Sequence, residues 1–195
     1  MYNKETFSRA FILLGKLLEI QEFPPIELYV CGGSALLWED IISRPTKDVD
    51  IVAVSVVPEK KIIQAEPLPK PLIQAAEQVA RDLGFHSGWL NTGPSDLMKF
   101  GLPQGFEERI HTEKFGKSLT ISFLGRFDLI HLKVYAAVDK GPGKHVDDLQ
   151  ALNPNQNEIE AAALWATEHD SSPGFKKILK DMLFTLGFEN AAQKI

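Results

Sequence analysis

The chain has 195 residues, 44% of them hydrophobic and 24% charged, and its formal net charge is −5 at pH 7. This ordinary globular composition excludes a disordered, collagen-like or disulfide-scaffold protein. The acidic balance supplies no positive field for binding nucleic acid, and no apolar stretch approaches the roughly 20 residues of a membrane span, so we expect a cytoplasmic protein without a membrane partner.

Hydrophobic periodicity and turn residues predict the elements of the first half of the chain. They are a helix over 5–20, a strand over 26–31, a Gly-Gly turn leading into a short helix, a strand over 48–54 and a helix over 72–83. Residues 89–103 are predicted to be irregular. The single Cys31 ends an apolar run, which indicates a buried thiol.

The second half of the chain is predicted to be mainly helical after one hairpin. The predicted elements are strands over 106–111 and 118–124, a helix capped by Asp128 and ending near 139, a short helix near 146–152 and two further helices. This order predicts an α+β fold, with a small mixed β-sheet flanked by helices and a C-terminal helical tail. We expect one domain over residues 1–140 and a helical extension over 141–195 that packs on it.

Two aspartates begin the second predicted strand. Side chains alternate along a strand, so Asp48 and Asp50 project from the same face with Val49 directed to the other. Two neighbouring carboxylates repel unless a cation lies between them, and Mg²⁺ prefers such oxygen ligands. The pair therefore indicates a magnesium site, or alternatively two solvated acids at a strand start.

The Gly-Gly turn lies 14 residues before this pair. Gly32 and Gly33 let the backbone approach a ligand closely, and a turn that leads into a helix presents free N–H groups to an anion. The hydroxyl of Ser34 either binds a phosphate oxygen or caps the helix. A phosphate cradle followed by paired metal ligands points to nucleotide chemistry.

The residues from Gly32 to Leu36 and from Arg44 to Ile51 resemble the Gly-Gly-Ser and Arg-x-Thr-x-Asp-x-Asp signature of the nucleotidyltransferase superfamily. The segments 89–91, 128–137, 144–149 and 163–170 resemble an uncharacterised bacterial family related to AbiEii-type abortive-infection toxins and minimal nucleotidyltransferases. The resemblance implies a polymerase-beta-like fold, Mg²⁺ dependence, an NTP donor and the possibility of a cognate toxin or antitoxin partner.

The superfamily has a third carboxylate on a later strand. Here that strand has Thr120 and Ser122 where an acid is expected. Glu108, on the predicted partner strand of the hairpin, is a substitute, although a solvated sheet edge also explains it. Asp128 is interpreted as a helix cap rather than a ligand.

Other candidates for nucleotide binding surround the acids or follow from the resemblance. Arg44 and Lys47 flank the aspartates and either neutralise phosphate charge or lie solvated in a turn. In the resembling family Lys133 faces the cleft, which implies a triphosphate contact, whereas the alternative is a lysine at the edge of a core helix. Trp38, Trp89 and Trp165 are interpreted as core or cleft-wall residues, and Trp89 is the candidate among them for stacking on a base.

The leading hypothesis is a metal-dependent nucleotidyltransferase that transfers a nucleotidyl group from an NTP to a hydroxyl of RNA, a protein or a small molecule, in a toxin-antitoxin or phage-defence system. No DNA-binding motif is present. The alternative is a catalytically silent module of the same fold that binds a nucleotide or a partner.

Overall fold

A computed structural model describes residues 1–57 and 61–195 of the chain. Within these residues the predicted α+β fold is confirmed, with eight α-helices and one mixed sheet of six strands. The strands are β1 (Ile26–Cys31), β2 (Val49–Val56), β3 (Ile63–Gln64), β4 (Leu90–Asn91), β5 (His111–Lys114) and β6 (Leu119–Phe123). The helices are α1 (Lys4–Ile20), α2 (Gly32–Trp38), α3 (Lys70–Leu83), α4 (Arg126–Asp139), α5 (Gly143–Ala151), α6 (Gln156–His169), α7 (Pro173–Thr185) and α8 (Glu189–Gln193), with 3₁₀ turns η1 (Gly93–Lys99) and η2 (Phe106–Glu108).

The chain divides into two compact units. The sheet unit comprises Met1–Lys99 and Ile110–Leu124, and the helical unit comprises Phe100–Arg109 and Gly125–Ile195. The expected division near residue 140 differs from this one, because α4 makes its contacts with α5, α6 and α7. The sequence predicted two helices after the polar linker near residue 155. Among the described residues the structure has three there, α6, α7 and α8.

The sheet has the strand order β3-β2-β1-β6-β5, and β4 pairs with β2. β1 is antiparallel to β2 and parallel to β6. A β-bulge between Tyr29 and Val30 shifts the register, so that Cys31 lies opposite Asp50. This pairing brings the end of β1, where the Gly-Gly turn begins, to the start of β2, where the acids lie.

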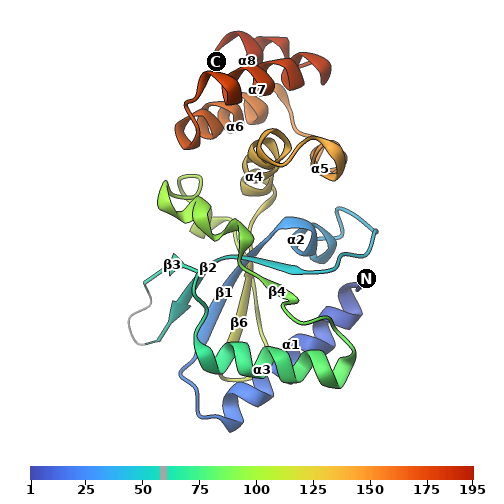
Figure 1. Cartoon of the computed structure of the whole chain (residues 1–195), viewed down its shortest axis with the longest axis vertical. Helices are drawn as coiled ribbons and strands as arrows, with labels where there is room; N and C mark the ends of the chain where they lie inside the picture. The colour runs from blue at the N-terminus through green and yellow to red at the C-terminus, as the bar shows by residue number, and fades with distance from the viewer. Residues whose placement is uncertain (58–60) are drawn as a thin grey trace. The chain divides into compact units, whose positions relative to one another are not determined.

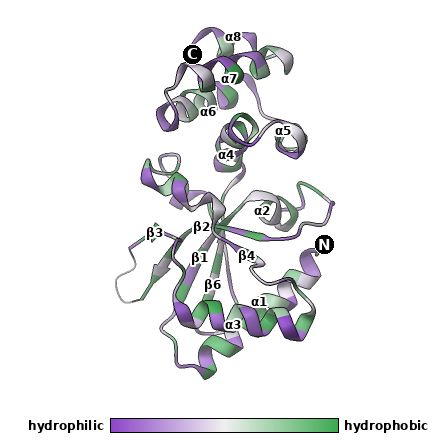
Figure 2. Cartoon of the chain, in the orientation of Figure 1, coloured by the Kyte–Doolittle hydropathy of each residue, from purple (hydrophilic) through white to green (hydrophobic). Residues whose placement is uncertain are grey.

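One face of the sheet is covered by α1 and α3, which lie side by side (Figure 1). The strands of this unit contain hydrophobic residues, drawn green in Figure 2. The largest buried side chains of the unit include aromatic rings. Phe11 contacts Trp38 and Trp89, with ring centroids 5.7 and 6.1 Å apart, and Trp38 stacks on Phe123 at 4.7 Å. Cys31 is buried, as predicted.

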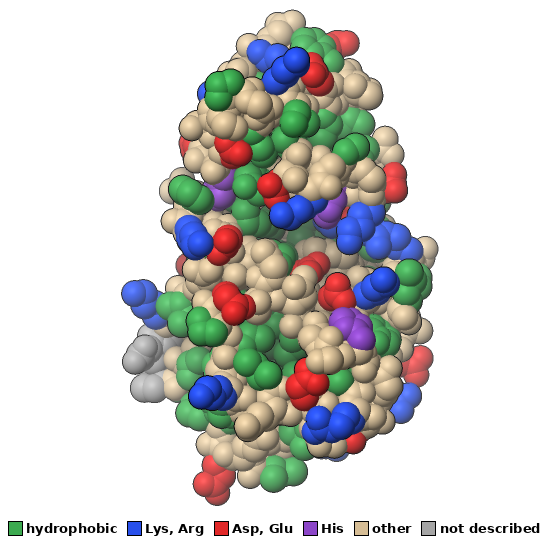
Figure 3. All heavy atoms as spheres, viewed as in Figure 1, with side chains coloured by type: hydrophobic (Ala, Val, Ile, Leu, Met, Phe, Trp, Pro, Cys, Tyr) green, Lys and Arg blue, Asp and Glu red, His purple; other side chains and the backbone are tan. Residues whose placement is uncertain are grey.

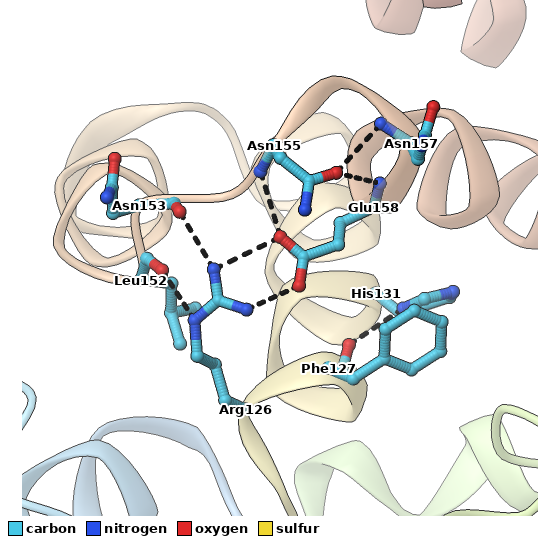
Figure 4. Close-up of polar contacts among 8 residues, drawn as sticks. All are labelled: Arg126, Phe127, His131, Leu152, Asn153, Asn155, Asn157 and Glu158. Atoms are coloured by element: carbon cyan, nitrogen blue, oxygen red, sulfur yellow. Dashed lines mark hydrogen bonds and ion pairs between the residues drawn. The ribbon is translucent and has the colours of Figure 1, made fainter.

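The helical unit is braced by Arg126 at the start of α4 (Figure 4). Its guanidinium donates to the carbonyl oxygens of Leu152 at 2.9 Å and Asn153 at 2.8 Å, and to both carboxylate oxygens of Glu158. Asn155 caps α6 and forms a capping box with Glu158. One arginine thereby ties the end of α5 to the first turn of α6.

Two predictions about acidic residues near the hairpin are wrong. The hairpin itself forms from β5 and β6, but Glu108 lies in η2, before β5, because Gly105 adopts φ 75° and turns the chain into a 3₁₀ helix. Asp128 does not cap α4, whose N-cap is Gly125. It is fully buried and accepts two hydrogen bonds from Arg109, at 3.1 and 2.6 Å.

No helix among the described residues is long and apolar enough to cross a membrane. On the surface seen in Figure 3, basic and acidic side chains are interspersed. This distribution agrees with the absence of a strong positive field in the sequence.

Candidate functional site

The Gly-Gly turn is the first turn of α2. Gly32 adopts φ 69°, a conformation that favours glycine, and Cys31 is the N-cap. Ser34 is buried and its hydroxyl donates to the carbonyl oxygen of Cys31 at 3.2 Å, so its predicted role as N-cap is wrong. The helix begins three residues earlier than expected, because its N-cap is Cys31 rather than Ser34 and both glycines lie in its first turn.

The carboxylate of Asp50 lies against this turn. A Cβ atom at Gly32 would fall 1.9 Å from Asp50 Oδ2, and one at Gly33 would fall 3.3 Å from Thr46 Oγ1 and 3.9 Å from Arg44 Nη1. The turn, the basic residue and one acid of the pair are therefore neighbours. Only glycine at position 32 leaves room for the carboxylate.

Asp50 has an amide partner on the neighbouring strand. β4 pairs in parallel with β2 and sets Asn91 opposite Asp50. The side-chain amide of Asn91 donates to Asp50 Oδ1 at 2.6 Å, and its carbonyl oxygen accepts from the backbone N–H of Gly93 at 3.0 Å. One oxygen of this carboxylate is thus oriented by a neutral donor.

Asp48 has a histidine partner. Nε2 of His86 lies 2.9 Å from Asp48 Oδ1 and 3.1 Å from the carbonyl oxygen of Lys47, and Nδ1 lies 2.7 Å from the carbonyl oxygen of Ser87. All three partners are acceptors, which favours a ring protonated at both nitrogens. The Ser87 carbonyl first, and then Lys47 and Asp48, raise the pKa of His86.

The segment that carries Arg44 and the acids is tied to the N-terminus. The backbones of Tyr2 and Thr46 form an isolated antiparallel bridge. The Tyr2 hydroxyl accepts from the backbone N–H of His86 at 2.9 Å, and its ring stacks on Phe85 with centroids 3.8 Å apart. Tyr2 therefore links the two segments that hold the acid and its histidine, one through its backbone and the other through its side chain.

Other predicted site residues lie elsewhere or are differently placed. Lys47 is an exposed neighbour of Asp48. Lys133 belongs to the helical unit, where its buried ammonium donates to Asp148 at 2.6 Å. Glu108 also belongs to that unit and is exposed. Trp89 has no exposed surface and its indole donates to the Ala76 carbonyl, so it is the core residue that the sequence indicated and the alternative that it stacks on a base is wrong.

The strand β6 offers hydroxyls rather than an acid on its polar face. Ser122 is fully buried, donates to the carboxylate of Glu27 and lies 2.9 Å from the hydroxyl of Thr112. Glu27 lies four residues before Cys31 on β1, which is about 13 Å along a strand from the turn. Across residues 1–57 and 61–195, no group of three or more His, Cys, Asp or Glu side chains is disposed to hold a metal.

A surface hollow of about 520 Å³ lies between the start of α1 and the loop after α2. Lys4, Asp40 and Ser43 are among the residues that line it, and neither aspartate of the pair does.

Sequence reasoning missed the two partners of the aspartates. Asn91 and His86 lie about 40 residues beyond the acids, and nothing in the local pattern assigns either a role. The signal that was present was the short apolar run ending in Asn91, which the sequence-based prediction treated as irregular. Comparisons of the chain with protein-family models, with curated proteins and with solved structures gave no match.

Proposed function

We propose that the chain is a metal-dependent nucleotidyltransferase, which transfers a nucleotidyl group from an NTP to a hydroxyl of an RNA, protein or small-molecule acceptor. The observation that carries the proposal is the contact between Gly32 and the carboxylate of Asp50. It places the Gly-Gly turn, for which the sequence predicts phosphate binding, beside an acid suited to a cation, which is the combination that the chemistry needs.

Mg²⁺ is the cation that the proposal requires. Asp48 and Asp50 would supply carboxylate oxygens, with Asp48 giving up its contact with His86 to do so, and Mg²⁺ binds through one or two carboxylates together with waters and substrate phosphates. When bound, the cation neutralises charge on the attacking and leaving oxygens. Gly32 and Gly33 allow close approach of the triphosphate, and Arg44, beside Gly33, neutralises phosphate charge.

In this reaction the acceptor oxygen attacks the α-phosphorus of the NTP in line with the leaving group. The new O–P bond forms as the bond from the α-phosphorus to the bridging oxygen breaks, which releases pyrophosphate and the hydroxyl proton. Asp48 and Asp50 are the residues that would hold the cation, and a bound cation would help to keep the reactants in this geometry.

The test is transfer of label from α-labelled NTPs in the presence of Mg²⁺, with total RNA or lysate as acceptor. Asp48→Ala and Asp50→Ala are expected to abolish transfer. Asp82→Asn, which alters an exposed acid on α3 of the same unit, serves as the matched control and should transfer label normally. Transfer that persists in both alanine variants would disprove the assignment of the site.

The composition of β6 favours a second candidate, a catalytically silent module that binds a nucleotide. Thr120 and Ser122 occupy the strand where the superfamily has its third acid, and Ser122 is engaged with Glu27. Calorimetry and the label-transfer assay together separate the two candidates. The silent module binds an NTP with Mg²⁺ in calorimetry but transfers label to no acceptor.

A further inference from the structure

Backbone pairing, rather than the side chain of Asn91, determines where this residue lies. β4 runs parallel to β2 with Asn91 opposite Asp50. The N–H of Val49 donates to the carbonyl oxygen of Trp89 at 2.8 Å, and Trp89 is fully buried. The pairing of β4 with β2 therefore places Asn91 beside Asp50 at the same end of the sheet.

The orientation of the Asn91 amide follows from its neighbours. The backbone N–H of Gly93 can only donate, so the atom that faces it at 3.0 Å is the carbonyl oxygen of the amide. The NH₂ group then faces Asp50 Oδ1 at 2.6 Å. Both ends of the amide are engaged, which prevents it from turning away from the carboxylate.

A neutral donor has a specific consequence for a carboxylate that binds a cation. It fixes the orientation of one oxygen and itself brings no positive charge to the site, whereas a lysine or arginine in place of Asn91 would compete with the cation. On its other side, the carboxylate lies against Gly32. Asp50 is thus held between a backbone turn and an amide.

We propose that Asn91 is a positioning residue that holds the carboxylate of Asp50 in the orientation in which it binds a divalent cation. The inference rests on the function proposed above, because it takes Asp50 as a ligand of the cation. Asn91 itself touches neither substrate nor metal in this arrangement, and it acts through Asp50.

The first test is Mn²⁺ binding measured by calorimetry on the full chain. Asn91→Leu keeps the size of the side chain but removes the donor, and we expect its affinity for Mn²⁺ to fall about 10-fold, as is typical when an outer-shell partner of a ligand is lost. Gln64→Leu is the matched control. Gln64 donates to the carboxylate of Asp96 at 2.9 Å in the same unit, so its loss removes a similar bond without touching Asp50.

The second test is the position of Asp50 in metal-free crystal structures of the wild type and of Asn91→Leu. We expect the carboxylate to rotate away from its wild-type orientation in the variant. If Asn91→Leu does not fold, Asn91→Ser replaces it, because serine keeps an acceptor for the Gly93 N–H but is too short to reach Asp50.

The two tests separate the inference from the proposed function. An unmoved Asp50, or a variant that binds Mn²⁺ as tightly as the wild type does, would overturn the positioning role. A wild type that binds no Mn²⁺ would overturn the proposed metal site, and a rotated Asp50 in the variant would then show only that Asn91 orients the carboxylate.

Discussion

The backbones of Tyr2 and Thr46 form a reciprocal pair of hydrogen bonds. The N–H of Tyr2 donates to the Thr46 carbonyl at 2.7 Å, and the N–H of Thr46 donates to the Tyr2 carbonyl at 3.1 Å. The Tyr2 ring stacks on Phe85 and its hydroxyl accepts from the backbone of His86. The segment that carries the acids is therefore attached to the body of the sheet unit through Tyr2.

Replacement of Tyr2 by alanine is expected to loosen this segment. Because Tyr2 is partly exposed, the loss of its ring should cost about 1–3 kcal/mol of unfolding free energy, below the roughly 3–5 kcal/mol of a fully buried ring. Hydrogen exchange at the Thr46 amide should become faster. Tyr2→Phe, which keeps the stacked ring and loses one hydrogen bond, should cost only about 0.5–1.5 kcal/mol. Unchanged exchange at Thr46 in Tyr2→Ala would show that the bridge holds without the ring.

Because Gly32 lies against the carboxylate of Asp50, adding one methyl group at position 32 should strongly lower the stability of the protein. Gly32→Ala places a Cβ atom 1.9 Å from Asp50 Oδ2 at a residue with φ 69°. We expect about 1–2 kcal/mol of destabilisation from the left-handed backbone and about 1–3 kcal/mol more from overpacking. Urea unfolding measures both.

Gly84→Ala is the control that isolates the backbone contribution. Gly84 adopts φ 71° at the end of α3, and a Cβ atom there meets nothing within 4 Å. Its substitution should cost only the strain of the backbone. Equal costs for Gly84→Ala and Gly32→Ala would mean that the carboxylate of Asp50 moves aside without penalty.

Local patterns were sufficient to predict the elements that carry the candidate site. The 3.6-residue period predicted α1, the prolines before α3 and Gly84 after it predicted that helix, and β-branched alternation predicted β2. The Gly-Gly turn and Asp50 meet because β1 and β2 are sequential neighbours that pair in the same sheet. Short-range pairing of this kind is accessible to sequence reasoning.

Long-range partners were not accessible. β4 has only two residues, which is too few to show the alternating pattern of a strand. The side-chain amide of its Asn91 donates to Asp50, 41 positions earlier in the chain. Asp128 precedes an apolar run, as a cap would, but it turns inward to Arg109, 19 residues before it. Such ion pairs and amide contacts depend on tertiary packing, which no local pattern encodes.

The buried pair of Lys133 and Asp148 predicts a stability effect in the helical unit. The side chains are 6% and 1% exposed, and the ammonium lies 2.6 Å from the carboxylate. Lys133→Met leaves a buried carboxylate without this partner, which should cost about 3–5 kcal/mol in urea unfolding.

An exposed lysine–aspartate pair provides the comparison. Lys4 and Asp40 lie 2.9 Å apart with side chains 43% and 80% exposed. Lys4→Met should change stability by no more than about 1 kcal/mol, because solvent screens the pair. A cost for Lys133→Met as small as that for Lys4→Met would show that water or another residue readily replaces the lysine.

His131 predicts a loss of stability on acidification. Its desolvation by burial lowers the pKa, against the raising effects of the Phe127 carbonyl, Asp128 and Glu158 and with a lowering contribution from Arg109. Nδ1 lies 2.8 Å from the Phe127 carbonyl, so the neutral ring donates there. Folding therefore favours neutral His131.

The relevant pH range lies between the lowered pKa of folded His131 and its ordinary value of about 6.5. In this range the unfolded chain binds more protons than the folded one. The free energy of unfolding therefore falls as pH falls, by up to about 1.4 kcal/mol per pH unit. At higher pH the contribution is fully present. His131→Phe removes this dependence, whereas other titrating groups remain common to both proteins. The difference in unfolding free energy between wild type and His131→Phe should therefore shift against the wild type from pH 7 to pH 5. A difference that stays constant over this range would show that folded His131 binds its proton as readily as the unfolded chain does.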